Sequence, residues 1–185
     1  MAYKLDKLII IDVESTCWEG EPPVDQLSEV IEIGICCLNM TSGVISDPVS
    51  IYIEPKHSTV SEFCTKLTGI TQELLDSKGI PFPKAAEILK SEYQLDKRGW
   101  ASWGDYDRKM MDSMFTMYSL KNLIAKTTHI NLKNLHALMY ELKRELGTGA
   151  ALNMMGFQFE GRQHSGRDDA RNIGKIARVL FKKAI

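Results

Sequence analysis

Short apolar stretches dominate the first third of the chain, a pattern typical of strands. An apolar run at 8–11 leads into Asp12, which predicts a strand at about 7–14, and an Ile- and Val-rich stretch at 29–39 predicts a second. A turn signal at 39–43 then favours a third strand at 44–54. Pro48 places that strand at a sheet edge or at a bulge. We therefore expect an antiparallel three-strand meander.

The rest of the chain changes to helical periodicity, interrupted by short strands. Strands are predicted at 100–103 and near 128–132, and Gly147 is expected to end the second-last helix. No repeat or linker divides the sequence, so we expect a single domain over residues 1–185, an α/β sandwich on one mixed sheet. The predicted helices are 61–67, 71–77, 83–94, 105–120, 133–146 and 166–183.

Composition and charge exclude little. The chain has 23 Lys and Arg residues and 24 Asp and Glu residues, a formal charge of −1. The net charge therefore does not indicate a nucleic-acid-binding protein, and any basic binding surface would have to be local. The four cysteines form no C-x-x-C pair and are expected to be reduced thiols, which favours a cytoplasmic protein. The apolar run before Asp12 is too short for a signal peptide or a membrane span, so no membrane is expected as a partner.

Two carboxylates end the first predicted strand. Because strand side chains alternate, Asp12 and Glu14 point to the same face. The preceding isoleucines favour burial over the alternative of two surface residues on an edge strand. Burying two like charges is costly unless a basic partner or a cation lies between them. No lysine or arginine lies inside the run, which favours a metal.

Helical periodicity chooses between neighbouring acids later in the chain. Asp107 lies on the apolar stripe of the helix at 105–120, whereas Asp105 resembles an N-cap, although Asp105 as the ligand and Asp107 as a second capping residue is the alternative. On the final helix Asp169 shares its face with apolar residues and Asp168 does not. Four inward carboxylates from three elements predict a site for two Mg²⁺ or Mn²⁺ ions.

A histidine lies close to this set in sequence. His164 precedes the final helix in a polar, glycine-rich stretch, from which it could reach the carboxylates. Because histidine titrates near neutrality, it could take a proton from a water activated at the cluster, as a hydrolytic site requires. The alternative is an ordinary exposed loop histidine.

Together these residues resemble a known family. Asp12-x-Glu14, the pair Tyr106-Asp107, and His164-x4-Asp169 are similar in order and spacing to the motifs of DEDDh 3′→5′ exonucleases, a DnaQ-like group with an RNase H-like fold. The resemblance covers residues 5–181 and is strongest to the KapD-like branch, which includes histone-mRNA and small-RNA trimming exonucleases. The segments that favour this branch are 15–18 (Ser-Thr-Cys-Trp), 67–71 (Leu-Thr-Gly-Ile-Thr) and 161–164 (Gly-Arg-Gln-His).

The resemblance implies a role for each motif residue. Asp12 would bridge two cations, Glu14 and Asp169 would complete one site, and Asp107 would support the other. His164 would be the general base. Tyrosine-type relatives place Tyr four residues before the last Asp, where this chain has Ser165, so the histidine class is favoured.

Substrate contacts are also implied by position. The matching residues would hold the 3′-terminal nucleotide, and Trp18 could stack on a base, although a core position for Phe63 and Leu67 and a sheet-edge position for Trp18 are the alternatives. Arg167 begins a basic stripe on the final helix and could meet a phosphate, with Arg162 as an alternative contact. Trp100 and Trp103 are expected to be structural. The predicted substrate-binding residues are Ser15, Thr16, Trp18, Phe63, Leu67 and Arg167.

The sequence therefore predicts a metal-dependent exonuclease that removes nucleoside 5′-monophosphates from the 3′ end of single-stranded RNA or DNA. No obligate protein partner is expected. Two alternatives stay open: a catalytically silent nucleic-acid-binding or regulatory module, and a polymerase proofreading subunit, which would need a partner-docking segment.

Overall fold

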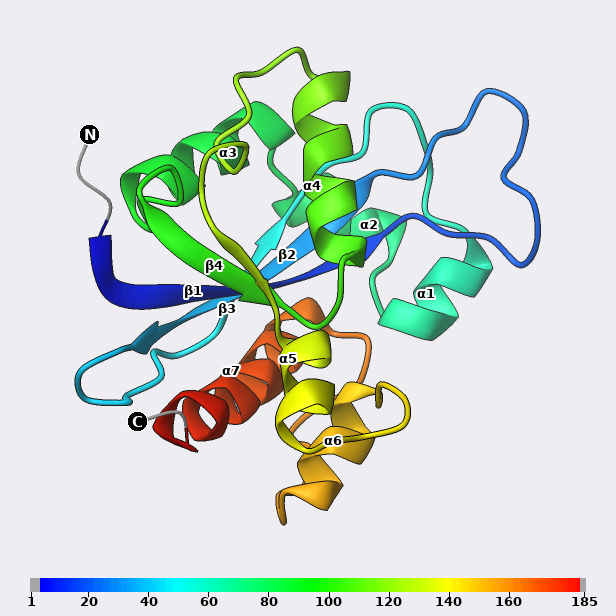
Figure 1. The fold of residues 1–185 in the computed structure, drawn as a ribbon. Helices are drawn as coiled ribbons and strands as arrows, with labels where there is room; N and C mark the ends of the chain where they lie inside the picture. The colour runs from blue at the N-terminus through cyan, green and yellow to red at the C-terminus, as the bar shows by residue number, and fades with distance from the viewer. Residues whose placement is uncertain (1–3, 184–185) are drawn as a thin grey trace.

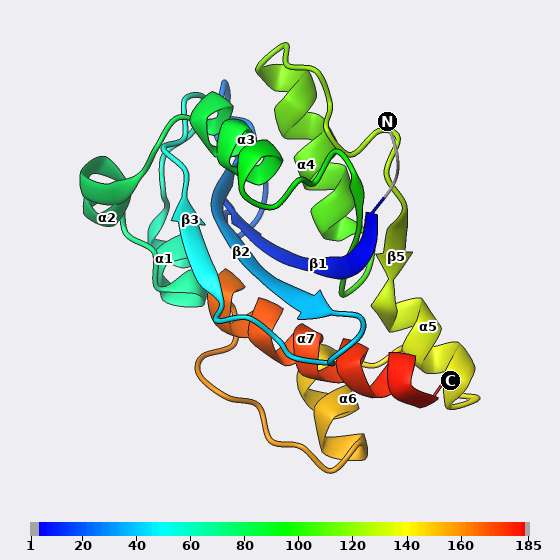
Figure 2. The ribbon, with the colours of Figure 1, turned by 90° about the vertical axis from the view of Figure 1, so that its left-hand side faces the viewer.

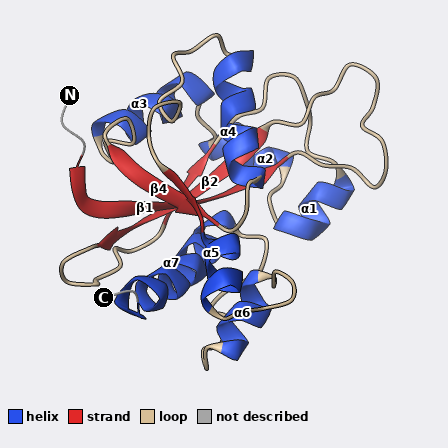
Figure 3. Ribbon diagram, in the orientation of Figure 1, coloured by secondary structure: helices blue, strands red, loops and turns tan. Residues whose placement is uncertain are grey.

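A mixed sheet forms the centre of the protein in the computed structural model, which describes residues 4–183. Within that range the sheet has five strands in the order β3-β2-β1-β4-β5. β1 pairs antiparallel with β2, and β2 with β3, whereas β4 runs parallel to β1 and β5 parallel to β4. The predicted meander and the mixed sheet are confirmed (Figure 3). The strands are β1 (Lys4–Ser15), β2 (Val30–Asn39), β3 (Val49–Tyr52), β4 (Arg98–Ser102) and β5 (His129–Asn131).

Helices cover both faces of the sheet (Figures 1 and 2). Ile9, Ile11 and Val13 of β1 pack in a core with residues of α3 (Phe82–Ser91) and α4 (Tyr106–Met117). Leu8 and Ile10 face the other way, into a core with α5 (Leu132–Met139), α6 (Thr148–Met154) and α7 (Gly166–Lys183). Because side chains alternate along β1, Asp12 and Glu14 belong to the face that α7 covers.

Two short helices stand at the carboxyl end of β1. α1 (Glu62–Thr68) begins at Ser61, whose hydroxyl accepts the Cys64 N–H, and ends at Gly69, which has a left-handed φ of 77°. α2 (Gln72–Lys78) follows directly and begins at Thr71. Both helices were predicted, and they pack on β2 through a small core that includes Ile31.

The third predicted strand was too long. The ladder of β3 covers only Val49–Tyr52, and the earlier part of 44–54 forms a loop joined to β2 by a single bridge between Leu38 and Ile45. Pro48 precedes β3, which is an edge strand, as its position in the sequence predicted.

The predicted helix at 133–146 was also wrong. α5 ends at Met139, and the chain turns at Glu141, which has a φ of 52°. A non-glycine residue occupies the left-handed position, so no glycine signal marked this end. Gly147 does not end a helix but is the N-cap residue of α6, which was missed. Among the described residues, no helix has an apolar stretch of membrane-spanning length.

Candidate active site

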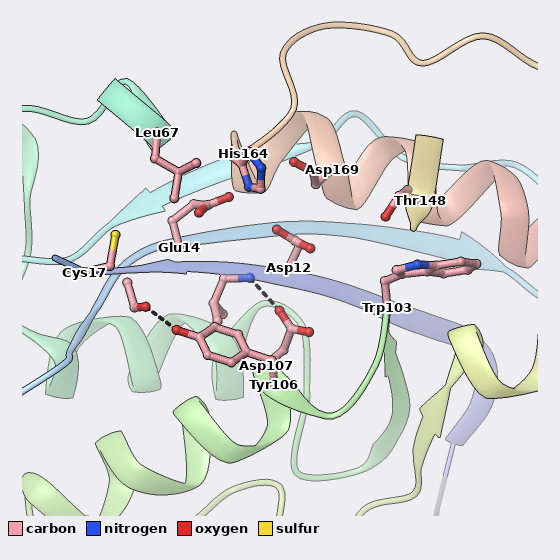
Figure 4. A pocket seen from close by; sticks show the side chains of 12 residues that line it. Asp12, Glu14, Cys17, Leu67, Trp103, Tyr106, Asp107, Thr148, His164 and Asp169 are labelled. Atoms are coloured by element: carbon pink, nitrogen blue, oxygen red, sulfur yellow. Dashed lines mark hydrogen bonds between the residues drawn. The ribbon is translucent and has the colours of Figure 1, made fainter. Parts of the chain in front are cut away.

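A pocket of about 350 Å³ opens at the carboxyl end of β1 (Figure 4). The residues on its wall that have a predicted chemical role come from three elements and one loop: β1, α4, α7 and the loop before α7. All five residues with a predicted chemical role line it. They are Asp12, Glu14, Asp107, His164 and Asp169.

Three of the carboxylates form a compact group. One oxygen from each of Asp12, Glu14 and Asp169 lies within 4.8 Å of the others. Asp12 and Glu14 come from one face of β1, and Asp169 comes from the first turn of α7. Such a set of oxygens fits a divalent cation such as Mg²⁺ or Mn²⁺.

A glycine contact brings α7 close enough to complete this group. Gly34 of β2 is the register partner of Asp12, and a Cβ atom on Gly34 would lie 1.8 Å from the carbonyl carbon of Gly166. Only glycine leaves room there for the start of α7. The approach places Asp169 over β1, beside Asp12.

The pocket is electrostatically costly without a cation. Burial raises the pKa of Asp12 well above its ordinary value, and the carboxylates of Asp107 and Asp169 raise it further. Burial, followed by Asp169 and Glu32, raises the pKa of Glu14 to about 8. Burial likewise raises the pKa values of Asp107 and Asp169, each to about 6. A bound cation would reverse this, because it favours the ionised form of every carboxyl group.

Asp107 lies in the pocket but outside the three-carboxylate group. Its Oδ1 accepts a hydrogen bond from the Val13 N–H at 2.9 Å. Val13 lies beyond the last residue of β1 that pairs with β4, so its N–H is open to this side chain. Asp105 lies elsewhere: it accepts hydrogen bonds from Arg108 and Asn131 and makes no side-chain cap. Asp168 also stays outside the pocket lining, and its carboxylate accepts the Arg162 N–H.

His164 reaches the pocket from the loop between α6 and α7. The residue is exposed and has a φ of 60°, a conformation that an L-residue seldom adopts. Figure 4 shows its imidazole beside Leu67, on the side of the pocket that faces Glu14. It therefore stands at the open side of the carboxylate group.

The predicted substrate contacts divide into two groups. Ser15 and Leu67 line the pocket, and the Ser15 hydroxyl forms a hydrogen bond with the Tyr106 hydroxyl. Thr16 is fully buried, and its hydroxyl is bonded to Ser58 and to the Glu29 N–H, so its side chain does not reach the pocket. The structure also leaves three residues outside the pocket lining: Trp18, Phe63 and Arg167.

Glu32 is a residue of the site that sequence reasoning missed. It is 2 % exposed, pairs with Glu14 across β1 and β2, and accepts the Gly166 N–H at 3.0 Å and the Ser50 hydroxyl at 2.6 Å. The carboxylate therefore satisfies a free N–H group at the start of α7 and adds negative charge beside the cluster. Its signal was one acidic residue inside an otherwise apolar strand.

Sequence reasoning also treated the two tryptophans of the β4 region alike. Trp100 is fully buried in the core, as expected. Trp103 lines the pocket together with Thr148, while its Nε1–H donates to the Leu146 carbonyl at 3.0 Å. Trp103 is therefore part of the pocket wall and not only of the core.

Known proteins similar to this chain share both its sequence pattern and its fold. The Exonuclease (RNase_T) family profile matches residues 9–177. The 3′-5′ exoribonuclease 1 of Rattus norvegicus is 34 % identical over 181 residues, which cover 93 % of this chain and 52 % of that protein. The chain spans 28 % of the ERI1 exoribonuclease 2 of Xenopus laevis, which is 32 % identical over 197 residues, and 52 % of the rat protein.

Two solved structures show the same likeness in three dimensions. The nuclease domain of 3′hExo, a DEDDh family member bound to rAMP, superposes with a TM-score of 0.86 and 30 % identity, covering 99 % of this chain and 95 % of that chain. A 3′-exonuclease in a structure of 3′-end-specific recognition of a histone mRNA stem-loop gives a TM-score of 0.85 and 28 % identity, covering 99 % of this chain and 84 % of that one.

Proposed function

This chain belongs to the exonuclease family of DEDDh nucleases, and from that membership we propose that it hydrolyses RNA from the 3′ end and releases nucleoside 5′-monophosphates. One observation carries the proposal: the three grouped carboxylates and His164 meet in a single open pocket. A cavity of about 350 Å³ suits one small ligand, here the terminal nucleotide, and not a duplex.

Two divalent cations are the proposed cofactors. Asp12, Glu14 and Asp169 would hold one of them, with Asp12 shared between both, and Asp107 would support the second. When bound, the ions would polarise the scissile phosphate and stabilise the charge that develops on the leaving oxygen. The raised pKa values of Glu14 and Asp12 support this assignment, because a group of buried acids needs a compensating charge.

The side chains of the protein would handle the proton and the terminal nucleotide. An imidazole nitrogen of His164 would accept the proton of the attacking water as its oxygen bonds to phosphorus. The bond from phosphorus to the 3′ oxygen of the preceding nucleotide breaks as the new bond forms, that oxygen takes up a proton from solvent, and His164 returns its proton to solvent. Leu67 and Ser15, on the pocket wall, would contact the terminal nucleotide.

RNA is the proposed substrate on the strength of the relatives. The rat protein is named an exoribonuclease, and the second solved structure concerns the 3′ end of a histone mRNA stem-loop. A silent binding module is less consistent with a pocket in which every carboxylate and the histidine of the family pattern are present.

The test is a degradation assay on matched 5′-labelled single-stranded RNA and DNA with Mg²⁺ or Mn²⁺. We expect a ladder that shortens from the 3′ end of the RNA, suppression by a 3′-phosphate, and loss of cleavage in Asp12→Ala. Asp107→Asn should lower the rate about 10- to 100-fold, whereas its neighbour Asp105→Asn should not.

Cleavage that persists in Asp12→Ala would refute the proposed site. A protein that binds RNA without degrading it under any metal would support the binding module. Faster degradation of the DNA strand would keep the chemistry and correct the substrate.

A further inference from the structure

The loop that carries His164 is held at one point by an arginine. Arg162 lies two residues before His164, between α6 and α7. Its Nη2 donates to the carbonyl oxygens of Lys66 and Leu67, each at 3.1 Å. These carbonyls belong to the last turn of α1, where helical carbonyl groups lack partners within the helix. The guanidinium, which belongs to the His164 loop, therefore caps the carboxyl end of α1.

A glycine makes room for this cap. A Cβ atom on Gly69 would lie 1.7 Å from Nη1 of Arg162, so the guanidinium rests directly on the backbone of that residue. Gly69 also takes the left-handed conformation that ends α1. Both the shape and the hydrogen bonds of the end of α1 thus fit an arginine side chain.

The backbone of Arg162 is held from the opposite side. Its N–H donates to Oδ2 of Asp168 at 2.9 Å, and Asp168 is the immediate neighbour of Asp169 on α7. The same carboxylate lies against Gly161, where a Cβ atom would come within 2.3 Å of it. Arg162 therefore joins the last turn of α1 to the first turn of α7.

The charge of Arg162 also acts on the carboxylate group. Burial is the main cause of the raised pKa of Glu14, and Arg162 opposes it. Two residues of the pocket wall adjoin this bridge: Leu67, whose carbonyl Arg162 binds, and His164, two residues further along the chain (Figure 4).

We propose that Arg162 is a positioning residue that latches the His164 loop to the carboxyl end of α1, so that His164 stands over the carboxylates. This proposal rests on the proposed exonuclease function. It assigns Arg162 a role in holding the loop, because its Nη2 bonds two carbonyl groups of α1. A lysine at this position would keep the charge but not the planar fork of donors.

A double-mutant cycle with His164 tests the latch, using the full chain and the RNA assay. Arg162→Ala and Arg162→Lys should each lower kcat about 10- to 100-fold, with KM changed less than about threefold. In the His164→Ala background, adding Arg162→Ala should cost less than about twofold more, because the latch acts through the histidine. Arg144→Ala, which changes an exposed loop arginine between α5 and α6 outside the pocket lining, is the matched control and should behave like the wild type.

A second measurement does not depend on activity. Hydrogen exchange across residues 156–165 should become faster in Arg162→Ala and Arg162→Lys while the Tm stays within a few degrees of the wild type. Equal losses in both His164 backgrounds, or an effect on KM alone, would overturn the latch and identify a substrate contact. Unchanged exchange in the loop would overturn it as well. An inactive wild type would instead refute the proposed function and leave the exchange result to decide on the latch.

Discussion

Replacing Glu14 by glutamine should stabilise the metal-free protein, and more so as the pH rises. Glu14 is 8 % exposed, and burial together with Asp169 and Glu32 raises its pKa from 4.5 to about 8. Between these values the folded protein retains a proton that the unfolded chain releases, so this carboxyl group lowers the free energy of unfolding as the pH rises. Glutamine has nearly the same shape and does not ionise.

The size of the effect follows from the pKa values. Each rise of one pH unit between 4.5 and about 8 lowers the free energy of unfolding of the wild type by about 1.4 kcal/mol. The free energy of unfolding of Glu14→Gln should therefore exceed that of the wild type by less than about 1 kcal/mol at pH 5 and by about 4 kcal/mol at pH 8. The same substitution removes a proposed metal ligand, so the stabilised variant should have lost its nuclease activity.

Urea unfolding in EDTA at pH 5 and pH 8 measures the difference. Glu87→Gln, an exposed position on α3, is the control and should stay close to the wild type at both values. A Glu14→Gln advantage that is the same at both pH values would refute the electrostatic reasoning. Adding Mg²⁺ or Mn²⁺ to the wild type at pH 8 should recover part of the lost stability, because a cation offsets the buried charges.

Two further substitutions probe how α7 is placed. Glu32→Gln removes the charge that faces the start of the helix and one of the acceptors there. It should lower the free energy of unfolding, measured by urea unfolding, by about 1–3 kcal/mol. No change would mean that water replaces the lost carboxylate oxygen. Gly34→Ala should cost about 1–3 kcal/mol and lower the affinity for metal in a thermal-shift titration, because the new methyl group meets the Gly166 backbone. The control Gly147→Ala, which faces open space, should change stability by less than about 1 kcal/mol.

Most of the fold was predictable because its signals are local. The apolar runs of β1 and β2, the turn between strands and the caps of α1 and α2 each depend on a few neighbouring residues. Helical periodicity also predicted which acid faces inward in each of two pairs, Asp105 with Asp107 and Asp168 with Asp169. The end of α5 was not predictable in this way, because Glu141 adopts a conformation that the sequence signals reserve for glycine.

The parts of the site that were missed depend on contacts between residues far apart in sequence. Gly34 has no local signature, and an acid inside an apolar strand marks Glu32 as unusual without indicating its role. Each residue acquires its role only when α7 packs across β2. Helical and strand periods give the direction of a side chain but not the element that it will meet. The roles of these two residues therefore depend on long-range packing.

The prediction of a metal depends on the charges around Asp12 and Glu14. It rested on the lack of any lysine or arginine inside the strand that carries Asp12 and Glu14. The structure does bring a cation near, because Arg162 lowers the pKa of Glu14 from a distant loop. Burial and the surrounding carboxylates nevertheless outweigh it, and that pKa stays at about 8. One arginine, engaged with the end of α1, leaves the group short of positive charge, so a divalent cation remains the simplest compensation.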